Sequence, residues 1–187
     1  IHRLLQKQEG DDYQSEVPLS FACDYQGVHF LVEGRADGII TGEKGVTVDE
    51  IKTTSVPMDM ITESFQEPHW AQAQCYGYFM CVQRNLDSIT IRLTYYQTET
   101  EEVKRFTRRF SRDSLRQFYE GLLERYVEWA VWQAEWRQIR NRSIEMLHFP
   151  FASYRKGQRE MAAAVYRTIS SQARLYCQAP TGIGKTI

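Results

Sequence analysis

Asp37, Glu50 and Lys52 have the residue types and the spacing to bind a divalent cation beside a phosphate. They lie in the segments GRADGII and GVTVDEIKTT, which we expect to form two strands of a hairpin around the turn TGEKG. If Thr41 pairs with Val46, the same register places Asp37 directly opposite Glu50, with Cβ atoms about 4.5–5.5 Å apart. Two carboxylates this close repel each other unless a positive charge lies between them.

A divalent cation and the lysine can supply that charge. Mg²⁺ prefers oxygen ligands and commonly takes only one or two carboxylates from a protein. Lys52 projects from the same strand face as Glu50, because side chains alternate along a strand, so its ammonium can orient a water or a phosphate oxygen. Asp49 points to the other face and is not expected to take part. The alternative is a solvated hairpin face without chemistry, and a one-residue change of register would separate the two carboxylates.

The sequence GRADGI, with Glu-x-Lys thirteen residues after the aspartate, resembles the core of the PD-(D/E)XK nucleases and in particular their RecB-like exonuclease branch. The resemblance implies an α/β fold with a restriction-endonuclease-like core, in which helices flank a mixed central sheet. It also implies that Asp37 and Glu50 bind Mg²⁺ or Mn²⁺, together with the backbone carbonyl of Ile51. Lys52 would help to activate the attacking water.

The segment HWAQAQCYGYF carries a second feature of this branch. On a helix, His69, Gln72 and Tyr76 lie on one face. Gln72-x-x-x-Tyr76 matches the Q-x-x-x-Y signature that, in the RecB-like branch, follows the active-site strands and contacts DNA and the active-site region. Gln74-x-x-x-Tyr78 also matches, although His69 shares a face with the first pair only. The alternative is a half-buried helix whose Gln and Tyr satisfy local hydrogen bonds.

The beginning of the chain, IHRLLQ, offers another metal ligand by the same resemblance. The branch places a metal-binding His on an N-terminal helix in a pattern like G-x-x-x-H-x-x-L, and His2 with Leu5 matches its second half. Glu16 stands where many relatives have an acidic supporting group. Several relatives hold an iron–sulfur cluster on four cysteines. No cluster is predicted here, because the cysteines have no close-spaced group: they are Cys23, Cys75, Cys81 and Cys177.

The C-terminal segment QAPTGIGKT matches a phosphate-binding loop, except that Ala179 replaces the first glycine. It resembles superfamily 2 helicases of the DinG/XPD type, and FASYRKGQREM resembles their adenine-contacting region. The acidic motif and the arginine that complete such a site are not in the chain. ATP is therefore expected as a cofactor of a full-length protein, without ATPase activity from this segment. The implied ATP-binding residues are Gln158, Gly182, Gly184, Lys185 and Thr186, with Tyr154 and Arg155 near adenine.

Periodicity predicts the elements that position these residues. The chain divides into a nuclease core at 1–110, a long connecting helix at 111–147 and the beginning of a helicase ATP-binding domain at 148–187. Strands are expected at 15–25, 25–40, 45–54, 87–100, 101–110 and 173–179, and helices at 69–84, 111–146 and 155–170. In the long helix, Leu115, Phe118, Leu122, Tyr126, Trp129, Val131 and Trp132 recur at roughly helical spacing.

Composition is that of an ordinary globular protein, with 42% hydrophobic and 25% charged residues and a formal net charge of −1. The basic stretch 104–116 interleaves Arg with Phe106 and Phe110, which suits binding to single strands and equally suits a solvated edge strand. The cysteine spacing indicates a reduced, cytoplasmic protein, and no apolar run has the length of a membrane span. Because the chain begins at Ile1 and ends within a motif, we expect it to be part of a longer protein.

Together these patterns predict a metal-dependent DNA nuclease, acting as an exonuclease on single-stranded ends within a nuclease–helicase protein. The expected partners are DNA and the rest of the helicase in the same full-length chain, without a membrane. One alternative is a catalytically silent, nuclease-like module that binds DNA and loads it onto the attached helicase. Another is a segment whose only activity is nucleotide binding.

Overall fold

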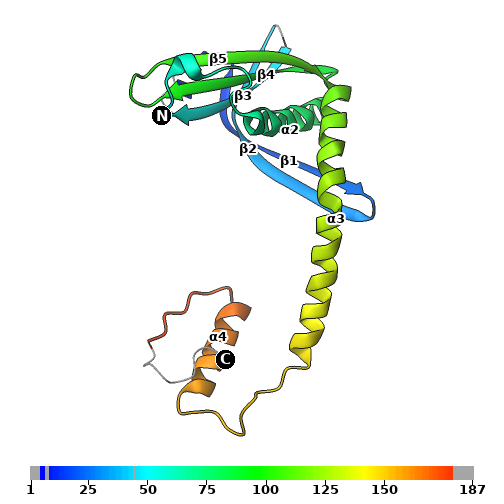
Figure 1. The fold of residues 1–187 in the computed structure, drawn as a ribbon, viewed down its shortest axis with the longest axis vertical. Helices are drawn as coiled ribbons and strands as arrows, with labels where there is room; N and C mark the ends of the chain where they lie inside the picture. Colours follow the sequence, from blue (N-terminus) through cyan, green and yellow to red (C-terminus); the bar gives the residue numbers. More distant parts are fainter. Residues whose placement is uncertain (1–4, 7–8, 44, 179–187) are drawn as a thin grey trace. The chain divides into compact units, whose positions relative to one another are not determined.

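A mixed five-stranded β-sheet is the centre of the first part of the chain (Figure 1). The structure is a computed structural model that describes residues 5–6, 9–43 and 45–178. The strands follow the order β1-β2-β3-β4-β5 across the sheet, and only β3 and β4 run parallel. Their bounds are β1 Tyr13–Tyr25, β2 Val28–Gly42, β3 Gly45–Thr54, β4 Ser88–Gln97 and β5 Val103–Ser111.

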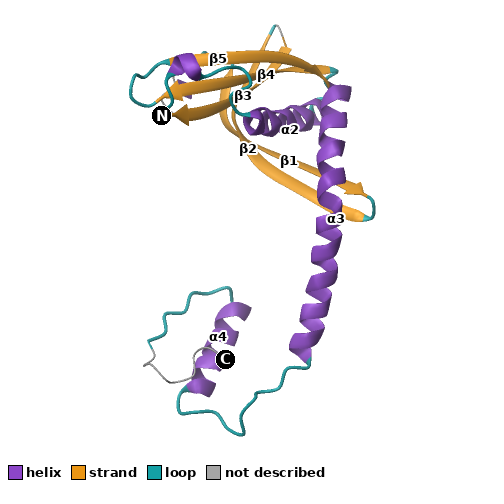
Figure 2. Cartoon of the chain, viewed as in Figure 1, coloured by secondary structure: helices purple, strands orange, loops and turns teal. Residues whose placement is uncertain are grey.

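A helical crossover joins the two parallel strands. A short 3₁₀ helix, η1 (Met58–Met60), follows β3, and α2 (Glu67–Gln83) then packs on the sheet before β4 begins. The inner side of α2 is buried, and Gly77 lets the helix approach β4 closely, because a Cβ at this position would lie 3.1 Å from Ile91 Cδ1. The predicted α/β class with a mixed sheet flanked by helices is therefore confirmed (Figure 2).

The hairpin of β2 and β3 has the predicted register. Thr41 pairs with Val46, and the ladder runs from Gly42–Gly45 to Gly38–Asp49. In this register Asp37 and Glu50 are the next two residues along the strands. Apolar side chains fix it, because Ile39 and Val48 are fully buried in the core and a shift of one residue would expose both.

Helix α3 (Arg112–Glu145) belongs to the core in its first half, so residue 110 does not mark the end of the packed body. Its buried residues, Leu115, Tyr119, Leu123 and Val127, recur every four positions and join the core cluster. The predicted apolar series instead included Tyr126, Trp129 and Trp132, which are exposed. Several periodic series coexist on one helix, and the sheet and α2 decide which of them is buried.

The chain divides into two compact units, 1–135 and 136–187. In the second unit, α4 (Gln158–Ser170) begins after Gly157, whose φ of 83° is a left-handed conformation that suits glycine. The strand predicted at 173–179 is wrong over residues 173–178, which have no strand structure. The described residues of this unit contain no second strand that could satisfy the backbone hydrogen bonds of the first. Gly182, Gly184, Lys185 and Thr186 lie outside the described residues, and so does His2.

None of the helices in the described ranges has both the length and the apolar character needed to span a bilayer.

Candidate active site

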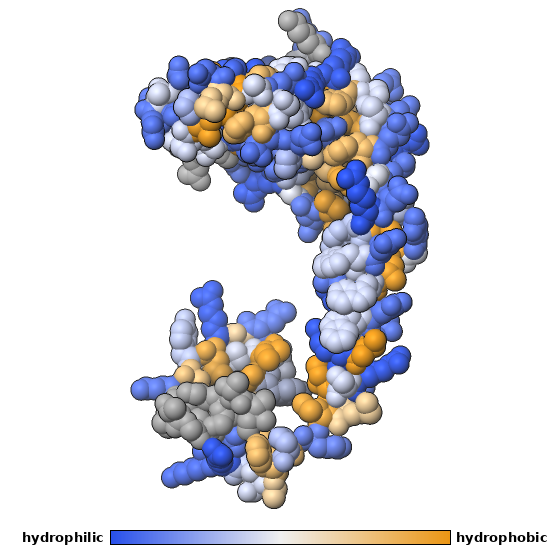
Figure 3. Space-filling view, in the orientation of Figure 1, coloured by the Kyte–Doolittle hydropathy of each residue, from blue (hydrophilic) through white to orange (hydrophobic). Residues whose placement is uncertain are grey.

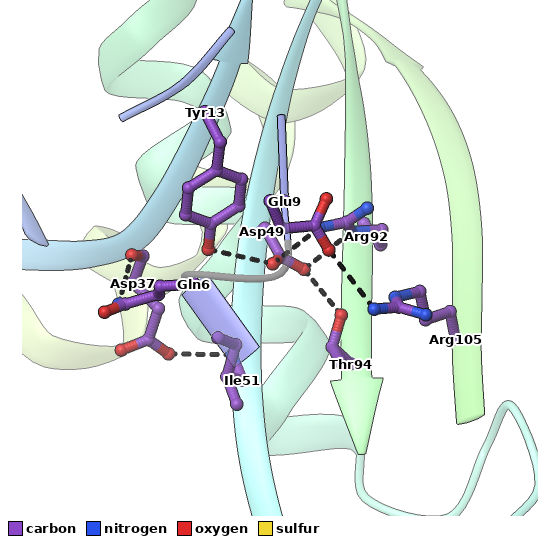
Figure 4. Close-up of polar contacts among 9 residues, drawn as sticks. All are labelled: Gln6, Glu9, Tyr13, Asp37, Asp49, Ile51, Arg92, Thr94 and Arg105. Atoms are coloured by element: carbon purple, nitrogen blue, oxygen red, sulfur yellow. Dashed lines mark hydrogen bonds and ion pairs between the residues drawn. The ribbon is translucent and has the colours of Figure 1, made fainter. Parts of the chain in front are cut away.

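Asp37 lies at an irregular point of β2. The ladder between β1 and β2 leaves out the pair Glu16–Asp37, and Glu16 has a left-handed φ of 55°. The Asp37 side chain turns toward β3, where its Oδ2 accepts a hydrogen bond of 2.7 Å from the backbone N–H of Ile51 (Figure 4). Gln6 Nε2 donates to the Asp37 backbone carbonyl at 2.9 Å and to Glu16 Oε1 at 3.3 Å. The carboxylate is thus held beside the strand that carries Glu50.

Glu50 is a buried carboxylate with one oxygen left without a partner. The residue is 2% exposed, and Oε1 accepts a hydrogen bond of 2.7 Å from Lys52 Nζ. Its Oε2 is fully buried and makes no hydrogen bond within the described part of the chain. Burial raises the pKa of Glu50 to about 7; the hydrogen bond from Lys52 lowers it, and the charge of Asp37 raises it. Such an orphaned oxygen is costly unless something binds it.

Lys52 links Glu50 to α2. Its Nζ donates to Glu50 Oε1 and, at 3.0 Å, to Gln72 Oε1. Gln72 Nε2 in turn donates to the Tyr76 hydroxyl at 3.3 Å. The structure therefore brings five of the predicted site residues together in one cluster: Asp37, Glu50, Lys52, Gln72 and Tyr76.

The second match to the Q-x-x-x-Y pattern lies elsewhere. Gln74 Nε2 donates to the backbone carbonyl of Trp70, and the Tyr78 ring packs against Phe21 and Tyr119. Tyr76, in contrast, lies against Gly34 of β2, where no Cβ would fit beside its ring. The geometry thus separates two patterns that the sequence left open.

A histidine and a tyrosine extend the cluster toward β4. Tyr95 is the partner of Lys52 in the parallel ladder, and its hydroxyl lies 2.9 Å from His69 Nδ1. Burial lowers the pKa of His69, and the nearby Lys52 lowers it further. The sequence pattern includes His69 but gives no direct sign of Tyr95. The only available signal was that a strand parallel to β3 had to follow the α2 crossover, and the sequence does not give the register of that pairing.

Asp49 takes part in a separate network on the opposite face of β3 (Figure 4). It is 1% exposed, and Arg92 binds both of its oxygens at 2.9 Å. Thr94 Oγ1 and the Tyr13 hydroxyl also donate to it, at 2.7 and 3.1 Å. Burial and the Asp49 charge raise the pKa of Tyr13, so the phenol stays protonated. Glu9 extends the network by ion pairs with Arg92 and Arg105.

The basic stretch 104–116 runs along β5, at the edge of the sheet, into the first residues of α3, and most of its cations have protein partners. Lys104 Nζ donates to the carbonyls of Met58 and Ile61, and Arg108 pairs with Glu63 while lying over the Trp70 ring. These contacts support the edge-strand interpretation.

Comparison with known proteins gives the family. A family model described as "PD-(D/E)XK nuclease superfamily" matches residues 1–167. The chain belongs to the PD-(D/E)XK nuclease superfamily. Members of this superfamily are typically metal-dependent nucleases. The match extends past residue 110 through α3 and into α4, which agrees with the burial of the first half of α3 in the core.

Two further comparisons add little to this. No curated protein matches the chain significantly. A solved structure titled "Crystal structure of SSO0001" is similar with a TM-score of 0.45 and 20% sequence identity, over 64% of this chain and 54% of that chain. The chain thus spans about half the length of that protein.

In this PD-(D/E)XK domain the donor set fits a divalent ion. No group of three or more His, Cys, Asp or Glu side chains suited to a metal occurs in the described ranges, which leave out His2. Two carboxylates suffice for Mg²⁺, which keeps several waters when bound. The buried Oε2 of Glu50, which accepts no hydrogen bond from any described residue, is the oxygen that such an ion would satisfy. The backbone of Ile51 faces the same side, since its N–H points to Asp37 and both backbone polar groups of a strand residue point the same way.

Proposed function

We propose that this domain hydrolyses phosphodiester bonds in DNA, as a Mg²⁺- or Mn²⁺-dependent exonuclease that acts on single-stranded ends. One observation supports the proposal most: a buried carboxylate oxygen of Glu50 has no partner among residues 5–6, 9–43 and 45–178, next to the charges of Asp37 and Lys52. A purely structural ion pair would have both oxygens satisfied, as those of Asp49 are. An unsatisfied buried polar group in a native fold calls for an explanation, and a bound ion is one such explanation.

Asp37, Glu50 and the Ile51 carbonyl would hold the ion, joined by His2 if the N-terminal segment follows the resemblance. When bound, a divalent ion lowers the pKa of water and offsets charge on the phosphate. The residues of the chain do the positioning. The Ile51 N–H fixes the Asp37 carboxylate beside β3, where it would bind the ion.

Lys52 would orient the attacking water and stabilise negative charge on the phosphate. Its ammonium has three donors, and Glu50 and Gln72 take two of them. These two contacts fix the orientation of the third N–H of the ammonium. Gln72 and Tyr76 would hold Lys52 in place and contact the DNA backbone.

The remaining parts of the proposal come from sequence alone. Residues 148–187 would begin a helicase ATP-binding domain of a nuclease–helicase protein, with ATP bound by Gln158 and by the loop that contains Lys185. A helicase would present single-stranded ends to the nuclease site. Gln158 is buried, and its Oε1 accepts a hydrogen bond from the Arg155 backbone N–H, which orients the amide at the beginning of α4.

Cleavage of labelled single-stranded DNA in Mn²⁺ tests the proposal. The wild type should shorten the strand from an end, and Asp37→Ala and Lys52→Ala should cut at least about a hundredfold more slowly while binding DNA equally well. Asp24→Ala and Lys156→Ala are matched controls at exposed positions and should cut like the wild type. If the wild type binds DNA but cuts no faster than the Asp37 and Lys52 variants, the domain is the silent DNA-binding module instead.

A further inference from the structure

The proposed site continues beyond Lys52 onto the neighbouring strand. Lys52 and Tyr95 are partners in the parallel ladder of β3 and β4, so their side chains lie next to each other on the face of the sheet that α2 covers. Gln72 binds Lys52, and His69, one helical turn earlier, meets Tyr95. Helix α2 therefore contacts both strands: Gln72 contacts Lys52 on β3, and His69 contacts Tyr95 on β4.

His69 is oriented and still accessible. Its Nδ1 lies 2.9 Å from the Tyr95 hydroxyl, which fixes the ring. The residue is only partly buried, and its Nε2 makes no hydrogen bond within the described part of the chain. Phe65 and Phe106 pack edge-on against the Tyr95 ring and hold the phenol in position. An oriented imidazole with an accessible ring nitrogen, beside a cationic lysine, can bind an anion.

We propose that His69, oriented by Tyr95, binds a phosphate of the DNA strand next to the one that is cut. This inference rests on the proposed nuclease function and assigns a substrate contact to that site. A phosphate oxygen only accepts hydrogen bonds, so the bound state requires a proton on Nε2. Nδ1 then accepts a hydrogen bond from the Tyr95 hydroxyl, and both ring nitrogens are satisfied.

The protonation states of the pair agree with this chain of donors. Burial raises the pKa of Tyr95, so its hydroxyl keeps its proton. Burial, with the nearby Lys52, lowers the pKa of His69, so the imidazole is neutral at pH 7. A neutral imidazole beside Lys52 adds a donor without adding a second positive charge to repel the lysine.

Chemical modification of single phosphates tests the contact. A neutral methylphosphonate is placed at each position of an oligonucleotide in turn, and kcat/KM is measured for the wild type and for His69→Ala. For the wild type, kcat/KM should fall about tenfold or more when the methylphosphonate replaces the contacted phosphate, because a hydrogen bond to a charged group is lost. His69→Ala should already have that loss with natural DNA, and should show no further loss at that position.

Three variants separate a contact from a structural role. His69→Gln, whose amide can donate near the position of Nε2, should recover part of the activity, and Tyr95→Phe should lose about fivefold. His29→Ala, at an exposed histidine of the β1–β2 hairpin, is the matched control. If His69→Ala stays as sensitive as the wild type at every methylphosphonate position, the inference is overturned.

Binding of the same oligonucleotides in Ca²⁺, measured by fluorescence anisotropy, distinguishes this failure from that of the proposed function. If the wild type cuts nothing but its affinity still depends jointly on His69 and on one phosphate, only the nuclease proposal fails. If it cuts and no phosphate is coupled to His69, only the phosphate contact fails.

Discussion

The two faces of strand β3 carry neighbouring carboxylates that are equally buried and differently satisfied. Asp49 is surrounded by donors, with Arg92, Thr94 and Tyr13 on its two oxygens. Within the part of the chain that the structure describes, Glu50 has a single donor, Lys52, and its Oε2 has none. The first face thus has the features of a structural ion pair, and the second has those of a site that is completed by a ligand. Burial alone would not distinguish the two carboxylates; the number of hydrogen-bond donors around each one does.

Removal of Asp49 should have the largest effect on stability. In Asp49→Ala the Arg92 guanidinium stays buried without its main partner, which costs about 3–5 kcal/mol of unfolding free energy. Urea unfolding followed by circular dichroism measures it, with Asp24→Ala, at an exposed carboxylate, as the control. A loss below about 1 kcal/mol would mean that the Asp49 face is no more structural than the Glu50 face.

Glu50→Gln should raise the free energy of unfolding, in contrast to Asp49→Ala, which should lower it. The folded-state pKa of Glu50 is about 7 against an unfolded value of 4.5, so its protonated form is favoured on folding. That contribution is complete below pH 4.5 and is lost as the pH rises through 7. The variant, which is neutral throughout, should therefore be more stable than the wild type by up to about 3 kcal/mol at pH 8, and about equal to it at pH 4. Urea unfolding at the two pH values measures the difference. Equal effects at both would contradict a buried, pH-dependent Glu50.

Binding of Mn²⁺ should depend on pH through the same carboxylate. An ion needs the ionised form of Glu50, so affinity should fall about tenfold per pH unit below 7 and level off above it. Isothermal titration calorimetry in buffers of different ionisation heat should detect release of about one proton at pH 6. Asp49→Asn removes the charge that pairs with Arg92 on the other face and should keep this pH dependence of Mn²⁺ affinity. If the variant loses the pH dependence, the ion binds through Asp49.

The smallest effect is expected at Tyr13. Tyr13→Phe removes one hydrogen bond to Asp49 and leaves Arg92 and Thr94 in place, so the loss should be about 1 kcal/mol. Differential scanning calorimetry can compare it with Tyr25→Phe, at a half-buried tyrosine in the same strand. A loss as large as that of Asp49→Ala would show that the phenol, and not the guanidinium, holds this network together.

Local spacing was enough to predict the hairpin and its register. The alternation of apolar residues in β2 and β3 and the short turn between them determine which residues face the core, and Glu50 and Lys52 share a face in any regular strand. The helical spacing of Gln72 and Tyr76 is local in the same way. The prediction of a strand after residue 173 was wrong because a strand needs a partner strand for its backbone hydrogen bonds, and local propensity cannot supply one.

The sequence by itself therefore determined the hairpin, the helix and the set of charged side chains that face one another across them. Only the tertiary structure decided what each charge does. The parallel pairing of β3 with β4 brings Arg92 to Asp49 and Tyr95 to Lys52, and the packing of α2 brings His69 and Gln72 above them. These contacts join residues far apart in the chain, and they depend on sheet order and on burial. The same burial raises the pKa of Glu50 and leaves its oxygen bare, because no donor other than Lys52 reaches it among the described residues.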